Sequence, residues 1–153
     1  MRQRTRVILG WLLAVVIAAS GGTAVQVHLN ASALAELGVA VPLVERAGML
    51  VHDLVHFAPL YAALIAAAFI VAWPVAAGLA WWRPRLRPLV FPLAGFCALA
   101  TLLVLMGLAL PITAIAAART PVGATLLCLA GAVAGVAYVA LTGNGRPRRP
   151  RTE

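Results

Sequence analysis

The sequence predicts an all-α membrane protein with four transmembrane helices and a short helical segment between the first and second, on the extracytoplasmic side. Hydrophobic residues make up 63% of the chain and charged residues only 10%, against about 25% charged in soluble domains. Four uncharged apolar runs are each long enough to cross a hydrocarbon core, which takes about 20 helical residues. We therefore expect residues 1–143 to form one transmembrane domain.

The first span is expected over residues 7–26. A basic start followed by an apolar run is also typical of a signal peptide, and Ala18-Ala19-Ser20 could serve as a cleavage site. The apolar run is longer than the usual core of a signal peptide, about 7 to 15 residues. An uncleaved first helix is therefore the favoured interpretation. Small residues recur on one of its faces at a spacing of four, which favours close helix packing; they are Ala14, Ala18 and Gly22.

A segment of mixed polarity, residues 31–56, follows the first span. Asn30 suits the N-cap of a short helix that Gly38 would end, and Pro42 suits the first turn of a second helix. The segment is too short to fold as an independent soluble domain. We expect a helical hairpin on or near the outer membrane surface.

The remaining spans are expected at residues 57–82, 89–111 and 121–142. Pro74 lies inside the second and should kink it without ending it. Thr120 and Pro121 form a cap and first turn for the fourth span. Gly131 and Gly135 form a GxxxG motif there, which predicts a helix-packing face. The tail, residues 144–153, is rich in proline and arginine and is expected to be disordered and cytoplasmic.

Ten of the twelve arginines lie in three clusters beside the apolar runs. The clusters are Arg2, Arg4 and Arg6; Arg83, Arg85 and Arg87; and Arg146, Arg148, Arg149 and Arg151. With four spans all three fall on one side, which the positive-inside rule assigns to the cytoplasm. The alanine-rich, lysine-free composition is typical of a bacterial protein. We expect an inner-membrane protein whose arginines contact anionic lipid and no nucleic acid.

Polar residues form a stripe along the helix expected over residues 43–57. Glu45, His52 and His56 fall within about 40° of each other at 100° per residue. Two histidines at i and i+4 can share a metal ion with a nearby carboxylate as third ligand. The segment His52–His56 lacks the glutamate of an HExxH motif, however, and a water-facing stripe on an interfacial amphipathic helix is the simpler interpretation.

Arg119 is a second candidate because it precedes the N-terminus of the fourth span. A cation beside the positive end of a helix dipole could hold an anion such as a phospholipid head group. The alternative is an ordinary arginine that extends its side chain to the membrane surface.

The spans contain no Asp, Glu, Lys or Arg, which disfavours an ion-coupled transporter acting alone. The only serines, Ser20 and Ser32, lie in no catalytic motif, so no enzymatic activity is expected. The sequence favours a structural or accessory subunit, or a lipid-interacting module, whose partners are lipids and another membrane protein or a second copy. No cofactor is expected. The alternatives are a divalent-metal-binding membrane protein and a small oligomeric transporter or channel.

Overall fold

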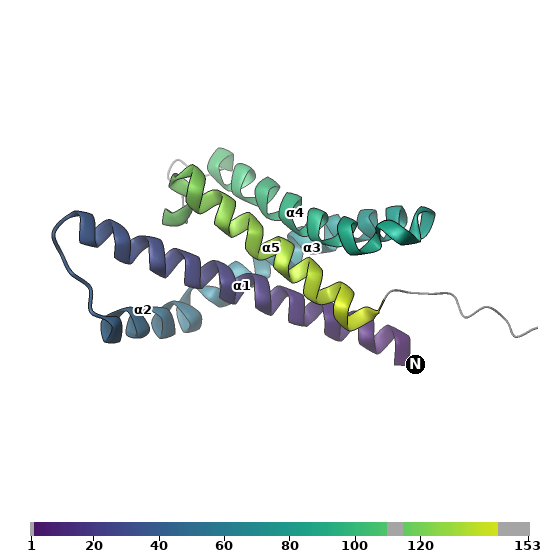
Figure 1. Ribbon diagram of the computed structural model, residues 1–153, viewed down its shortest axis with the longest axis horizontal. Coiled ribbons are helices and arrows are strands. Elements are labelled where there is room, and N and C mark those ends of the chain that lie inside the picture. The colour runs from purple at the N-terminus through teal and green to yellow at the C-terminus, as the bar shows by residue number, and fades with distance from the viewer. Residues whose placement is uncertain (1, 110–114, 144–153) are drawn as a thin grey trace, which may run out of the picture.

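The computed structural model describes residues 2–109 and 115–143 (Figure 1). These residues form five α-helices and two short 3-10 helices, and no β-strand occurs among them. The elements are α1 (Arg2–Glu36), α2 (Leu43–His56), α3 (Ala58–Trp82), η1 (Pro84–Leu86), α4 (Arg87–Ala109), η2 (Ala116–Arg119) and α5 (Pro121–Thr142). The predicted all-α fold class is confirmed.

Four of the helices, α1, α3, α4 and α5, are long and apolar enough to cross a membrane. Helix α3 continues through Pro74, as expected for a span in which neighbouring helices cover the freed backbone. Helix α5 begins at Pro121, and the Thr120 hydroxyl accepts a hydrogen bond of 3.1 Å from the Gly123 amide. The predicted cap of the fourth span is therefore confirmed.

The structure corrects the separate short helix predicted after the first span. Helix α1 runs without a break to Glu36, and Asn30 lies inside it instead of capping a separate helix. No glycine or proline occurs between Thr23 and Glu36, so nothing interrupts the backbone hydrogen bonds there. Gly38, with φ of 83°, follows the end of the helix as expected. At 1.5 Å per residue α1 is about 52 Å long, well beyond the roughly 30 Å of a hydrocarbon core.

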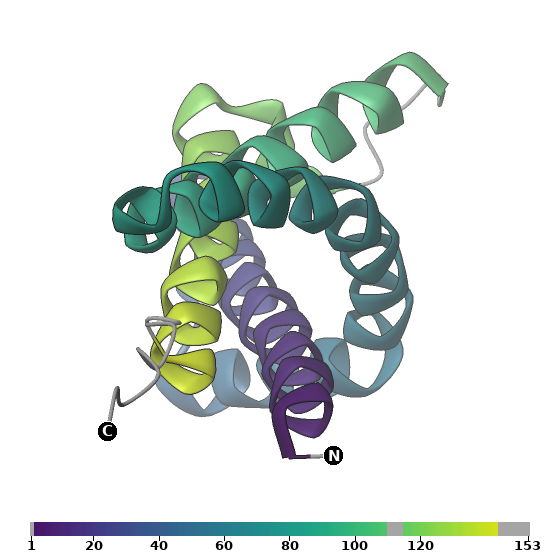
Figure 2. The same cartoon turned by 90° about the vertical axis from the view of Figure 1, so that its right-hand side faces the viewer.

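The four long helices form a ring in which α1 and α4 occupy opposite corners (Figure 2). Helix α1 packs on α3 and α5, and α4 packs on the same two helices. Aromatic side chains lie where the helices meet: the Trp73 ring centroid is 4.3 Å from that of Tyr138 and 5.8 Å from that of Phe91. Trp73 thereby joins α3 to both α4 and α5.

The helix ends that carry arginines lie together. The N-terminus of α1, the turn η1 and the C-terminus of α5 share one end of the molecule (Figure 1). A hydrogen bond of 2.7 Å from Arg87 Nη2 to Thr142 Oγ1 joins the start of α4 to the end of α5. We call this the basic end. The tail expected to be disordered, residues 144–153, lies outside the described residues.

Candidate functional site

A groove opens between α1 and α5 at the basic end, with a volume of 520 Å³. We call it the basic-end groove. Seven residues line it: Arg6, Leu9, Gly10, Leu13, Ala140, Leu141 and Gly143. Arg6 is the one charged residue among them, so the groove combines an apolar wall with a single guanidinium group.

Glycine at position 10 brings α1 close to α5 beneath this groove. A Cβ atom at Gly10 would lie 3.2 Å from side-chain carbons of both Tyr138 and Thr142, so these side chains would have to shift to admit a larger residue. At the other end of the groove Gly143, with φ of 71°, ends α5 in a conformation that L side chains rarely adopt. The two glycines place the last turn of α5 beside the first turns of α1.

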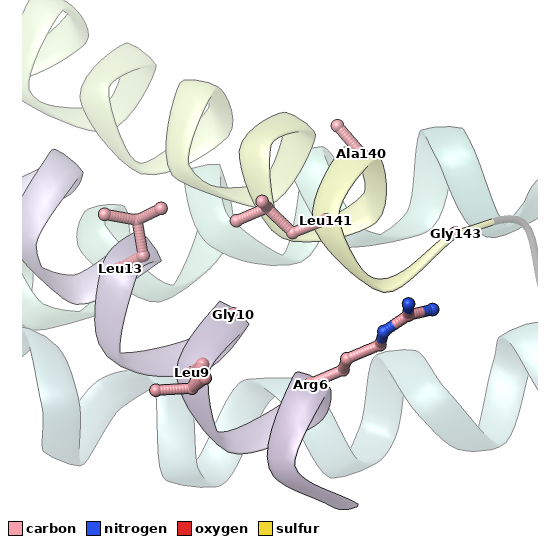
Figure 3. Close-up of a pocket in the computed structure, with 7 residues that line it drawn as sticks. All are labelled: Arg6, Leu9, Gly10, Leu13, Ala140, Leu141 and Gly143. Atoms are coloured by element: carbon pink, nitrogen blue, oxygen red, sulfur yellow. The ribbon is translucent and has the colours of Figure 1, made fainter. Parts of the chain in front are cut away.

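Three leucine side chains and one arginine side chain lie around the basic-end groove (Figure 3). Leu9, Leu13 and Leu141 are all exposed on the molecule's surface, where hydrocarbon would contact them in a membrane. The Arg6 side chain extends past the last turn of α5 toward Gly143. Within the described part of the chain no carboxylate pairs with this guanidinium. The positive charge of Arg6 thus lies at one end of the apolar lining formed by the three leucines.

The polar stripe lies on α2, which has no buried residue. Glu45, His52 and His56 are all exposed. The two imidazole rings are stacked with centroids 4.3 Å apart, and His56 Nδ1 donates a 3.0 Å hydrogen bond to the His52 carbonyl oxygen. One nitrogen of His56 is therefore engaged with the helix backbone.

A metal site of three protein ligands would need Glu45 or another group beside this pair. Among residues 2–109 and 115–143 no three His, Cys, Asp or Glu side chains come together in a group that could hold a metal ion. The described residues thus supply two imidazoles without a third ligand, whereas zinc sites in proteins commonly have at least three. Metal binding by this pair stays a prediction.

Arg119 is the last residue of η2 and directly precedes Thr120, the N-cap of α5. It is exposed, and the start of α5 that follows it lies at the end of the molecule away from the basic end (Figure 1). This is the position expected for contact with a head group on that side. Its role as an anion site stays a prediction.

The predicted packing residues of α1 are all buried. Ala14 and Ala18 are fully buried. Gly22 lies against Tyr61 of α3, whose ring a Cβ atom at this position would overlap. Gly10 lies four residues before Ala14 and contacts α5. The row of small residues therefore begins against α5, at Gly10, and ends against α3, at Gly22.

Gly131 and Gly135 of α5 lie against the backbone of α4. A Cβ atom at Gly131 would overlap the Gly95 carbonyl oxygen, and one at Gly135 would overlap the Phe91 carbonyl oxygen. Gly95, which sequence reasoning missed, completes the contact, since a Cβ atom there would overlap the Gly131 carbonyl. A single glycine in the middle of an apolar span was the signal available for it.

Sequence reasoning also missed the basic-end groove. The sequence groups Arg6 with Arg2 and Arg4 as a topology signal, and nothing in the spacing predicts that Leu141, near the other end of the chain, lines the same groove. Comparison with models of known protein families, with curated proteins and with solved structures finds no match.

Proposed function

We propose that this chain is a non-enzymatic integral protein of a bacterial inner membrane that binds an anionic phospholipid in the basic-end groove. The observation that carries the proposal is the position of the Arg6 guanidinium at the head of an apolar wall formed by Leu9, Leu13 and Leu141. A lipid phosphate can pair with the guanidinium while an acyl chain lies along the leucines.

The charge of the basic end supports an anionic head group. Arg4, Arg83 and Arg85 are exposed there, and Arg87 is held by its bond to Thr142. Basic residues near a membrane surface attract anionic lipids with about 1 kcal/mol each. The positive-inside rule places this end at the cytoplasmic leaflet. A protein that holds lipid in this way would act as a structural or accessory component of a larger membrane assembly.

The test is lipid binding by the purified protein in detergent, followed by native mass spectrometry during titration with phosphatidylglycerol. Loss of the groove's one charge in Arg6→Gln should weaken binding about fivefold, the equivalent of about 1 kcal/mol. Arg85→Gln removes the same charge from the same end but outside the groove, so a smaller effect is expected.

Phosphatidylcholine serves as the comparison lipid because its head group has no net charge. The wild type should prefer phosphatidylglycerol over it, and Arg6→Gln should lose most of this preference. Equal losses in Arg6→Gln and Arg85→Gln would show diffuse attraction to the basic end and contradict a site in the groove.

A further inference from the structure

A second groove lies between α1 and α2, which pack against each other at the end of the molecule away from the basic end (Figure 1). Its volume is 260 Å³, and we call it the hairpin groove. Ala24, Val27 and His28 line it from α1 at a spacing of i, i+3 and i+4. The α2 residues that line it have the same helical spacing between Leu43 and Leu50. Each set therefore occupies one face of its helix.

Two polar side chains, His28 and Arg46, line the hairpin groove, and no Asp or Glu lines it. The arginine is positively charged, and an imidazole carries an N–H donor in either protonation state. Glu45 lies about 100° around α2 from Arg46. Asp53 and Glu36 are seven and eight residues from Arg46 and His28 along the same helices, or at least about 10 Å along the axis. The hairpin groove thus has two donors and no lining carboxylate.

The Arg46 side chain is held by the loop that joins α1 to α2. Its Nε donates a 3.1 Å hydrogen bond to the Val41 carbonyl oxygen, and its backbone N–H donates one of 3.1 Å to that of Pro42. Within the described part of the chain, its two Nη groups and the His28 ring make no hydrogen bond or ion pair. A partly buried guanidinium fixed at Nε loses less conformational freedom when a ligand binds its Nη groups.

The hairpin groove lies at the depth of phospholipid head groups. Gly22 of α1 lies against Tyr61, which is three residues, or about 4.5 Å, after the start of α3 at Ala58. His28 is six residues, or about 9 Å, beyond Gly22 toward the end of α1. The groove is therefore about 5 Å beyond the level at which α3 begins. The head-group layer extends about 5 to 8 Å beyond the hydrocarbon on each side.

This combination of donors, size and depth suits a phosphate group. A guanidinium binds phosphate through two parallel N–H donors, and an imidazole N–H can donate to a further oxygen. The volume of 260 Å³ is below the usual range for pockets of drug-sized ligands, about 300 to 1,000 Å³, and so favours a small group. Val27, Leu43 and Leu50 form apolar walls beside the donors, which suits the glycerol and first methylene groups of a phospholipid.

We propose that the hairpin groove binds a phosphate group through the Nη groups of Arg46 and a ring N–H of His28. The phosphate belongs to a phospholipid head group or to a soluble compound, since both present the same oxygens to the two donors. This site goes beyond the proposed function, because it lies away from the basic end and shares no residue with the basic-end groove. Each proposal can therefore fail without the other.

The test begins with phosphatidylglycerol binding to the full-length protein in detergent, measured by native mass spectrometry. Arg6→Gln is the background, so that binding in the basic-end groove is already weakened. Adding Arg46→Gln should weaken the remaining binding about tenfold, because charge-assisted hydrogen bonds are lost. Adding His28→Phe keeps a flat ring but removes its N–H donors, so a loss of about threefold is expected.

A third variant tests the groove without removing either donor. Ala47 is an exposed residue of the lining, and Ala47→Phe should weaken binding by filling the groove. Two matched controls lie outside the groove: Arg85→Gln removes one charge at the basic end, and His52→Phe removes an imidazole from another face of α2. Each control should change the affinity less than twofold. Circular dichroism melts verify that every variant is folded.

Inorganic phosphate, titrated by isothermal titration calorimetry, distinguishes the two sources of the ligand. Saturable phosphate binding that Arg46→Gln weakens would support a site for which the phosphate alone is sufficient. Binding of phosphatidylglycerol only, with the same dependence on Arg46 and His28, would support a head-group site. Unchanged binding of both probes in folded Arg46→Gln and His28→Phe would overturn the proposal. Losses of equal size in Arg85→Gln and His52→Phe would also overturn it, because they would show attraction to net charge alone.

Discussion

At the scale of single residues, glycines determine how closely α4 and α5 approach. In a bilayer, water is absent from the helix contacts, so van der Waals packing provides much of the association energy. Gly95, Gly131 and Gly135 bring two backbones together where any side chain would overlap a carbonyl oxygen. This contact is therefore more sensitive to an added side chain than the lipid-facing surfaces of the same helices.

The first prediction follows from this contact. Gly131→Leu and Gly135→Leu should each lower the free energy of unfolding by at least about 1 to 3 kcal/mol, because the inserted side chain forces α4 and α5 apart. Thermal unfolding in detergent, followed by circular dichroism, measures the effect. Gly78→Leu is the control, since a Cβ atom there meets nothing within 4 Å, and it should unfold at or above the wild-type temperature. Wild-type stability in both α5 variants would mean that this interface is not tightly packed.

The glycines also show how far sequence alone predicts a contact. The spacing of Gly131 and Gly135 marks a packing face, because glycine at i and i+4 has few other uses in a span. The partner surface is not marked in the same way, since α4 has no second glycine four residues before or after Gly95. Small residues thus predict that one face of a helix packs against another helix. Which helix it packs against depends on the arrangement of the whole bundle.

At the scale of elements, α1 and α2 differ most from what their sequences indicate. Asn30 suggests that a separate short helix begins there, but α1 continues through it because nothing in the backbone stops it. Two of its polar side chains bond to their own helix: Thr23 Oγ1 donates to the Ala19 carbonyl oxygen, and Ser32 Oγ donates to that of His28. Polarity thus marks where a helix leaves the hydrocarbon, whereas its end requires a residue such as Gly38.

The second prediction concerns the histidines of α2. Replacing both, in the double variant His52→Gln and His56→Gln, should change the free energy of unfolding by no more than about 0.5 kcal/mol, because both side chains are exposed. Neither protein should retain zinc or copper after dialysis, since the described residues bring no third ligand to the pair. Metal analysis by mass spectrometry and a thermal melt measure the two effects. One metal ion per chain in the wild type, lost in the double variant, would instead support the metal-binding alternative.

At the scale of the whole molecule, the arginines explain why the fold is more predictable than the site. Apolar runs and flanking arginines determine the number of spans and which loops share a side, because both depend on the cost of placing charge in hydrocarbon. The basic-end groove depends on helices that are distant in the sequence. Arg6 and Leu141 line it together, and Trp73 contacts Tyr138, only after α1, α3 and α5 assemble. No local pattern in the sequence predicts that these residues lie together.

The last prediction tests the orientation of the molecule. The loop between α1 and α2 and the turn η1 lie at opposite ends of the bundle (Figure 1), so single cysteines at Ala40 and Leu86 report on opposite sides of the membrane. In a background with Cys97→Ala and Cys128→Ala, Ala40→Cys in intact spheroplasts should react with a membrane-impermeant thiol reagent. Leu86→Cys should react only after the membrane is permeabilised, because the positive-inside rule predicts that the arginines around it keep η1 on the cytoplasmic side. Labelling of Leu86→Cys alone in intact spheroplasts would reverse the orientation and move the proposed phospholipid site to the outer leaflet.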